Sequence, residues 1–181
     1  MLYEVHVTVE QGKDKPKIFG AKTINLELSS GKNRLQTLVG AKKEWIRYQD
    51  ALAWAKSLEE DLQSRGFKIV RTKLETPVST EKSVYKEAHW KFEVLDFREA
   101  FKALEHAKKY GFLVSWSSDR NNVFWLTKRF YGDAKYGPQF FKNLDSNMYT
   151  ELGIFGKGSV HFEDVLLDTN LDLDEGWMEF V

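Results

Sequence analysis

The chain has 181 residues, a length that suits one domain or two small fused lobes. Its 27 Lys and Arg residues balance 27 Asp and Glu residues, 42% of the residues are hydrophobic and only three are proline, which excludes a disordered or fibrous chain. The absence of cysteine excludes a disulfide framework, thiolate catalysis and any Cys-based zinc or iron–sulfur site.

The chain begins with a charged, strand-like segment and not with the pattern of a signal peptide. Its apolar runs are much shorter than the ~18 residues needed to span a bilayer. We therefore expect a soluble, cytoplasmic protein with no membrane partner. Residues 11–48 carry nine Lys or Arg against three acidic residues, and residues 159–181 carry seven acidic residues and no Lys or Arg. The basic segment can attract phosphate groups, but the two segments can equally face each other or solvent.

Apolar and polar side chains alternate along the first part of the chain. Residues 2–10 follow a strict period of two, which predicts a half-buried strand. Residues 24–28 alternate again, and a turn-prone segment at 29–33 lets residues 34–39 pair back on them. The sequence thus predicts a strand followed by a hairpin.

A helix is expected next. Asp50 is suited to cap its N-terminus and Gly66 to end it in a left-handed conformation. Between them, one apolar stripe follows helical spacing, formed by Ala51, Ala55, Leu58 and Leu62. A strand over residues 67–75 follows.

The second half of the chain shows the same mixture of patterns. Two further helices are predicted, over residues 96–110 and 138–152, the first from a capping box and the second from a proline in its first turn. The predicted strands are residues 84–95, 112–117, 123–130 and 159–167. This composition indicates an α+β fold with a largely antiparallel sheet. We expect two related split-βαβ-like lobes, residues 1–78 and 79–181, that form a bilobal or barrel-like cleft.

The sequence contains an internal repeat. Residues 4–10 read Glu-Val-His-Val-Thr-Val-Glu and residues 87–93 read Glu-Ala-His-Trp-Lys-Phe-Glu, an offset of 83 residues. A second likeness, a predicted helix followed by Gly-Phe and a strand, occurs at residues 66–67 and 111–112, only 45 residues apart. Either an insertion separates two duplicated halves, or one of the two likenesses is coincidental.

Two interpretations of the repeated polar face are open. Solvent-exposed antiparallel strands commonly carry such pairs of Glu with Lys or His. Alternatively, the two faces meet across a cleft and bind a phosphodiester between them. His6 and His89 would then be the catalytic acid and base, although their order cannot be assigned, and Thr8 and Lys91 would bind the non-bridging oxygens.

The motif His-Val-Thr-Val at residues 6–9 resembles the signature of the 2H phosphoesterases, the superfamily that includes 2′-5′ RNA ligase-like proteins and cyclic phosphodiesterases. The second motif would be His-Trp-Lys-Phe at residues 89–92, with Lys where the family has Thr or Ser. The resemblance implies two related α+β lobes that act on 2′,3′-cyclic or 2′-5′ phosphodiesters. It further implies a nucleotide or an RNA end as partner, and catalysis without metal or cofactor.

Other basic and aromatic residues fit a phosphate ligand. Arg71 and Lys73 alternate on one predicted strand face, and Arg129 lies on another, so all three are candidate phosphate ligands. Trp90, Trp116 and Trp125 could stack on a base, although tryptophans in strands more often pack in a core. In the last predicted strand, His161 and Glu163 share one face and suggest a third site histidine, a metal ligand or a hydrogen-bonded structural histidine.

A different phosphate chemistry competes with this interpretation. Alternating acidic and basic residues that face into an antiparallel barrel are similar to those of the triphosphate-tunnel (CYTH) enzymes, where acids hold a divalent metal and bases hold a polyphosphate. The corresponding residues would be Glu4, Glu10, Arg71, Lys73, Glu75, Glu87 and Glu93. The N-terminal Glu-x-Glu-x-Lys of that family is absent, because position 6 is His and position 8 is Thr. A non-catalytic binding or scaffold protein is the third possibility.

Overall fold

The structure, a computed structural model, describes residues 1–12, 14–28, 34–78, 80, 82–93, 98, 102, 105, 112–117, 119, 123–131 and 158–174. Its elements in chain order are β1 (Leu2–Glu10), β2 (Ala21–Leu28), β3 (Leu35–Glu44), α1 (Tyr48–Ser64), β4 (Ile69–Thr76), β5 (Tyr85–Glu93), β6 (Leu113–Ser117), β7 (Val123–Phe130), β8 (Gly158–Asp168) and the 3₁₀ helix η1 (Leu171–Asp174). In this part of the chain, no helix combines the length and the apolar character that crossing a bilayer requires.

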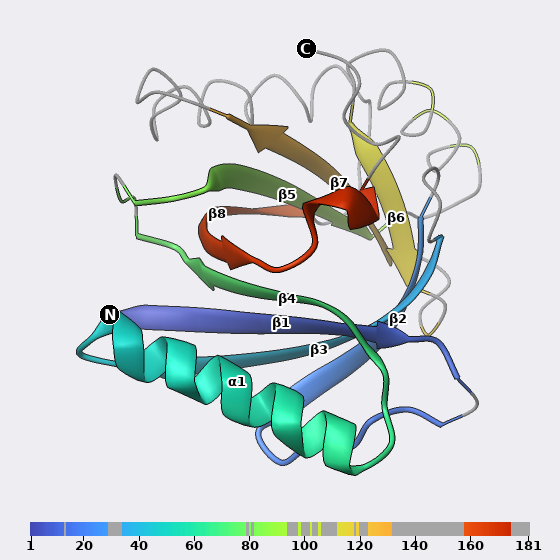
Figure 1. Ribbon diagram of the computed structural model, residues 1–181. Helices are drawn as coiled ribbons and strands as arrows, with labels where there is room; N and C mark the ends of the chain where they lie inside the picture. The colour runs from blue at the N-terminus through green and yellow to red at the C-terminus, as the bar shows by residue number, and fades with distance from the viewer. Residues whose placement is uncertain are drawn as a thin grey trace.

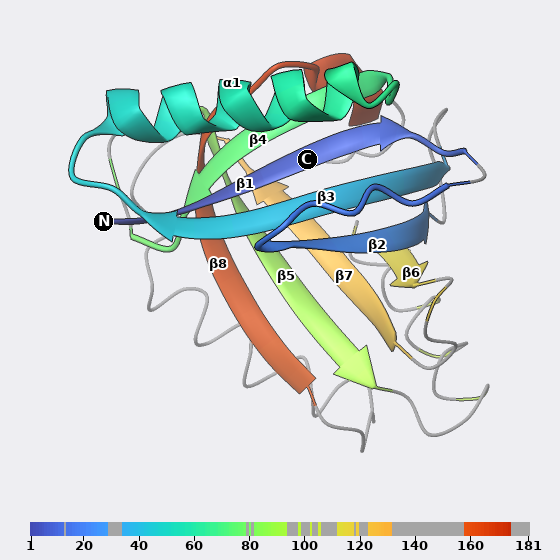
Figure 2. The same ribbon diagram turned by 90° about the horizontal axis from the view of Figure 1, so that it is seen from below.

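The strands form one closed antiparallel barrel, in the order β1-β3-β2-β6-β7-β5-β8-β4 (Figures 1 and 2). The expectation of an α+β fold with two split-βαβ-like lobes is therefore wrong. Every predicted strand is present, but β2 also pairs with β6 and β4 with β8, so the sheet continues from one half of the chain into the other. The predicted helices over residues 96–110 and 138–152 lie outside the described residues, apart from residues 98, 102 and 105.

The barrel consists of two halves with the same strand order. The first half of the chain contributes β2-β3-β1-β4 and the second contributes β6-β7-β5-β8, so β1 corresponds to β5, β3 to β7 and β4 to β8. The repeat at residues 4–10 and 87–93 therefore lies on corresponding strands. Residues 66–67 precede β4 whereas residues 111–112 precede β6, which do not correspond. The Gly-Phe likeness is thus the coincidental one.

Helix α1 covers the outer face of the first half, beside β1 and β4 (Figure 1). The predicted stripe is its buried face: Ala51, Ala55, Leu58 and Leu62. Gly66 has φ +85°, which confirms the left-handed conformation expected of it. The predicted cap is wrong, because the helix begins one turn earlier and Arg47 is the N-cap. Asp50 instead lies in the first turn, where it forms an ion pair with Arg47.

The apolar cores lie outside the barrel wall. On β1 the odd-numbered residues face α1 in one buried cluster, which includes Tyr3, Val5, Val7 and Val9. On β5 the corresponding outward residues belong to a second cluster, which includes Ala88, Trp90 and Phe92. Because side chains alternate along a strand, the intervening polar residues of β1 and β5 point into the barrel. The part of the repeated polar face formed by Glu4, His6, Glu87 and His89 is therefore internal, whereas Glu10 at the end of β1 is exposed.

Candidate functional site

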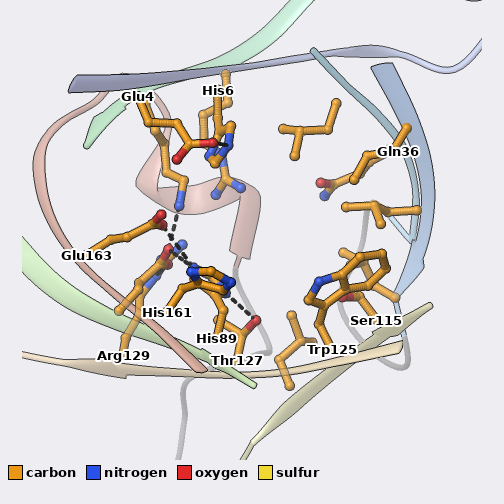
Figure 3. Close-up of a pocket in the computed structure, with 18 of the residues that line it drawn as sticks. Glu4, His6, Gln36, His89, Ser115, Trp125, Thr127, Arg129, His161 and Glu163 are labelled. Atoms are coloured by element: carbon orange, nitrogen blue, oxygen red, sulfur yellow. Dashed lines mark hydrogen bonds and ion pairs between the residues drawn. The ribbon is translucent and has the colours of Figure 1, made fainter. Parts of the chain in front are cut away.

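The barrel interior contains a cavity of about 250 Å³ whose lining is divided into two arcs. Charged and imidazole side chains from β1, β4, β5 and β8, joined by residues of β3 and β7, line one arc (Figure 3). Mainly apolar side chains from β2, β3, β6 and β7 line the other. The members of the apolar arc are Ile24, Leu26, Leu28, Gln36, Leu38, Leu113, Ser115 and Trp125. A ligand inside the barrel would meet ionic groups on one side and apolar surface on the other.

In the first half of the barrel, His6 lies between two carboxylates. Its Nε2 is 3.0 Å from Oε1 of Glu4, and its Nδ1 is 2.7 Å from Oε2 of the fully buried Glu75. Glu4 also forms an ion pair with Lys42, its neighbour on β3. Burial alone would lower the pKa of His6, but Glu75 and Glu4 raise it to about 10. His6 is therefore an imidazolium at neutral pH, and each of its nitrogens contacts a carboxylate.

The second half of the barrel contains an equivalent cluster around His89. Its Nε2 is 3.2 Å from Oε2 of Glu87 and 3.5 Å from Oε2 of Glu163, and its Nδ1 is hydrogen-bonded to Oγ1 of Thr127 at 2.9 Å. Glu87 also forms an ion pair with Arg129 on β7. Burial opposes protonation of His89, but Glu87 raises its pKa above the usual value. Each imidazole thus lies beside two glutamates, but only the His89 ring is also hydrogen-bonded to a hydroxyl group.

The strand registers show that the two clusters are copies of one arrangement. His6 pairs with Gly40 on β3 and Lys73 on β4, and His89 pairs with Thr127 on β7 and His161 on β8. The same registers relate Glu4 to Glu87, Lys42 to Arg129 and Glu75 to Glu163. Each copy therefore has a Glu-x-His strand, a base on one neighbouring strand and a second glutamate on the other.

Lys73 connects the two clusters across the barrel. Its Nζ lies 2.5 Å from Oε1 of Glu75 and 2.5 Å from Oε2 of Glu87, so one ammonium group bridges a carboxylate of each half. Burial alone would raise the pKa of each of these glutamates. Instead, Lys73 with His6 lowers the pKa of Glu75, and Arg129 with Lys73 lowers that of Glu87. His6 and His89 are thereby joined through a continuous chain of ion pairs.

Glu163 differs from the other glutamates of the site. The position that Lys73 occupies in the first half is His161 in the second, and burial together with Lys42 lowers the pKa of that histidine. Without a lysine at that position, burial and the charge of Glu75 raise the pKa of Glu163 to about 7. Glu163 is thus a cavity carboxyl that changes charge near neutral pH, which is typical of functional groups.

Five of the predicted site residues line this one cavity: His6, His89, Arg71, Lys73 and Arg129. Thr8 and Lys91 are not among the lining residues. Thr8 is buried on β1, whereas Lys91 is partly exposed and lies 3.8 Å from Glu93. The predicted roles of all seven residues in binding or catalysis stay predictions.

Sequence reasoning overlooked Lys42 and left the role of Glu163 open. Both could have been found by extending the repeat from β1 and β5 to their neighbouring strands, because the register places a base and a glutamate beside each Glu-x-His segment. Of the three tryptophans considered for stacking, only Trp125 is a lining residue. Trp90 is buried in the outer core, and Trp116 packs against that core while its Nε1 donates a hydrogen bond to Glu27.

The glutamates proposed as metal ligands in the tunnel-enzyme interpretation make ion pairs with protein cations. Glu4, Glu75 and Glu87 contact lysine, arginine or histidine side chains, as described above. Glu10 and Glu93 are not cavity residues and form ion pairs elsewhere. Among the residues that the structure describes, no three His, Asp or Glu side chains are placed to hold one metal ion.

Comparison with known proteins identifies neither a family nor a function for this chain. A scan against models of protein families finds no match, and a search of curated proteins finds no similar sequence.

Proposed function

We propose that the protein binds a small phosphate-bearing molecule of the nucleotide class inside its barrel. The observation that supports this most strongly is the division of the cavity lining into a charged arc and an apolar arc. A ligand with a phosphate at one end and a flat, weakly polar ring at the other is complementary to both arcs. The ligand would lie across the barrel, between the ion-pair network and Trp125.

The charged arc favours an anion. Its lining includes the four basic residues Lys42, Arg71, Lys73 and Arg129 against the three glutamates Glu4, Glu87 and Glu163. His6 adds a further positive charge, because its pKa is about 10, while Glu163 is only partly ionised at neutral pH because its pKa is about 7. An incoming phosphate could exchange places with carboxylates as the partner of these cations, forming charge-assisted hydrogen bonds with them.

The apolar arc favours a ring system. Trp125 points into the cavity, with Gln36 and Ser115 near it on the same side (Figure 3). An indole face stacks on any nucleobase, a contact worth about 1–3 kcal/mol per base. The nearby amide and hydroxyl groups are of the kind that bind the polar edges of such rings.

Hydrolysis by the histidine pair stays a prediction, and binding is the function that the geometry supports best. To act as a base, His6 would have to lose a proton that two carboxylates stabilise, which its pKa of about 10 disfavours at neutral pH. A cationic imidazole in this position serves better to attract an anion than to accept a proton.

The test is isothermal titration calorimetry with ATP, tripolyphosphate, adenosine 2′,3′-cyclic phosphate and adenosine. We expect the nucleotides to bind more tightly than adenosine or tripolyphosphate, because only they engage both arcs. Trp125→Ala should weaken ATP binding by about tenfold, the loss of one stacking contact, while tripolyphosphate binding changes little.

Two adjacent lysines of β3 provide a matched control. Lys42 lines the cavity, whereas Lys43 lies over the ring of Trp45, 4.4 Å from its centroid, on the other face of the strand. Lys42→Met should weaken ATP binding several-fold, and Lys43→Met should leave it unchanged. If neither nucleotide binds, or if both lysine variants behave alike, the proposal is wrong.

A further inference from the structure

Glu75 and Glu163 occupy corresponding positions in the two halves of the barrel but have different partners. Glu75 lies opposite Glu4 in the register and has two cations within 2.7 Å, the imidazolium of His6 and the ammonium of Lys73. Glu163 lies opposite Glu87, and its ion pair with His89 is longer, at 3.5 Å. His161 occupies the position that corresponds to Lys73, so the second half has a histidine where the first has a lysine. The second half therefore contains a cavity carboxyl that is only weakly neutralised.

Charged groups from every neighbouring strand surround Glu163. The acidic groups are Glu4 on β1, Glu75 on β4 and Glu87 on β5, and the basic groups are His6 on β1, Lys42 on β3, Lys73 on β4, His89 on β5 and His161 on β8 itself. Only 11% of the Glu163 side chain is exposed, and the carboxylate of Glu75 adds repulsion to the cost of burial. Its pKa is thereby raised to about 7, from an ordinary value of 4.5. At neutral pH, Glu163 is about half protonated.

An anion in the cavity would shift this balance. Beside an ionised Glu163, a phosphate group meets a like charge in a site of low dielectric constant, which weakens binding. Beside a protonated Glu163, the repulsion is absent and the carboxyl O–H can donate a hydrogen bond to a phosphate oxygen, as a neutral buried carboxylic acid can in other sites. The bound state therefore favours the protonated form.

We propose that the barrel takes up one proton from solvent, on the carboxylate of Glu163, when it binds its anion. This inference rests on the proposed function and specifies its regulation, namely that the ligand and a proton bind together. The affinity for an anion should consequently fall as the pH rises. The other glutamates of the site cannot play this role, because nearby cations hold the pKa of Glu4, Glu75 and Glu87 below the usual range.

The probes should not themselves titrate near neutral pH. Inorganic sulfate and adenosine 2′,3′-cyclic phosphate both keep a constant charge between pH 5.5 and 8.5, so a change in affinity reports on the protein. With the Glu163 pKa at about 7 in the free protein, the dissociation constant should rise about tenfold between pH 6 and pH 8. Calorimetry at pH 7.5 in two buffers of different ionisation enthalpy should show the uptake of up to about three-quarters of a proton for each probe molecule bound, because that fraction of Glu163 is ionised in the free protein.

Two variants assign the effect to Glu163. Glu163→Gln should bind each probe with an affinity that is nearly independent of pH, because the amide is neutral throughout. His161→Asn removes the neighbouring titratable group on the same strand and should retain the roughly tenfold pH dependence. If this dependence survives in Glu163→Gln, another group such as His89 takes up the proton and the inference is wrong.

Failure of the inference and failure of the proposed function give different results. Wild-type protein that binds a probe equally well at pH 6 and pH 8, without proton uptake, refutes the inference and leaves the proposed function intact. Wild-type protein that binds neither probe at any pH from 5.5 to 8.5, nor ATP, refutes both. Tighter binding at low pH that disappears in Glu163→Gln supports both.

Discussion

The imidazole of His6 lies directly against the backbone of Gly40, in space that a side chain at position 40 would fill. A Cβ atom placed on Gly40 would lie 3.1 Å from Cδ2 and 3.3 Å from Nε2 of His6. Both contacts are tighter than ordinary van der Waals packing. Thr127 takes the corresponding place beside His89, where its hydroxyl bonds to the ring. The two halves thus hold their histidines by opposite means, an absent side chain and a hydrogen bond.

Gly40→Ala should displace the His6 ring from its two carboxylates. We expect it to lower the free energy of unfolding by about 1–3 kcal/mol, the usual cost of overpacking, as measured by urea denaturation. In a His6→Ala background, the same substitution should cost much less, because the ring that it meets is gone. Gly12→Ala is the matched control, since a Cβ there has no neighbour within 4 Å. An equal cost of Gly40→Ala in both backgrounds would contradict this account.

The histidines should titrate at different pH values. NMR titration of the imidazole signals should place the pKa of His6 near 10, because Glu75 and Glu4 outweigh the effect of burial, and that of His161 below 6.5. Because the pKa of His6 is higher in the folded than in the unfolded protein, its stabilising contribution is complete below pH 6.5 and is lost as the pH rises through about 10. A His6 signal that titrates near 6.5 would show that the ring is not held as described.

Lys73→Met should strongly destabilise the protein, because it leaves the buried carboxylates of Glu75 and Glu87 without their shared cation. Removing one partner from a buried ion pair costs about 3–5 kcal/mol, which chemical denaturation at pH 7 can measure. The loss of stability should be smaller at pH 5, because the carboxylates left without Lys73 become protonated as the pH falls. Lys68→Met is the control, because Lys68 and its partner Glu10 are exposed and such pairs contribute about 0–1 kcal/mol. Comparable losses in the two variants would argue against the bridge.

Glu163→Gln should change the pH dependence of stability as well as that of binding. The folded-state pKa of Glu163, about 7, lies above its ordinary value of 4.5. Its contribution to stability is therefore present below pH 4.5 and is lost as the pH rises through 7. We expect Glu163→Gln to be about 3 kcal/mol more stable than the wild type at pH 8 and within about 1 kcal/mol of it at pH 5. Glu93→Gln, at a more exposed position, should match the wild type at both pH values.

Local sequence patterns were sufficient to predict the strands and helix α1. A period of two marks β1 and β2, and the stripe from Ala51 to Leu62 marks the buried face of the helix. The closed barrel could not be predicted in this way, because the alternation of apolar and polar residues does not determine which strands pair with each other. The pairings of β2 with β6 and of β4 with β8 join segments that are far apart in the sequence.

The alternation of apolar and polar residues also does not determine which face of a strand points into the barrel. On β1, the apolar residues pack against a helix outside the barrel, and the polar residues His6 and Glu4 face the cavity. The usual assignment of polar faces to solvent therefore fails here. The internal repeat was the better guide to the site, because it identified His6 and His89, which the structure places at corresponding positions around one cavity.

Both joins between the halves are short. Along the described residues, β2 and β6 are paired over three positions and β4 and β8 over four, whereas β1 and β3 within the first half are paired over nine. Side chains supplement the shorter join, since Asp119 accepts a hydrogen bond from the backbone N–H of Asn25 and Glu27 accepts one from Trp116. Transient opening of the barrel wall should therefore begin there, on the apolar side of the cavity. Amide deuterium exchange should therefore be faster in β2 than in β1.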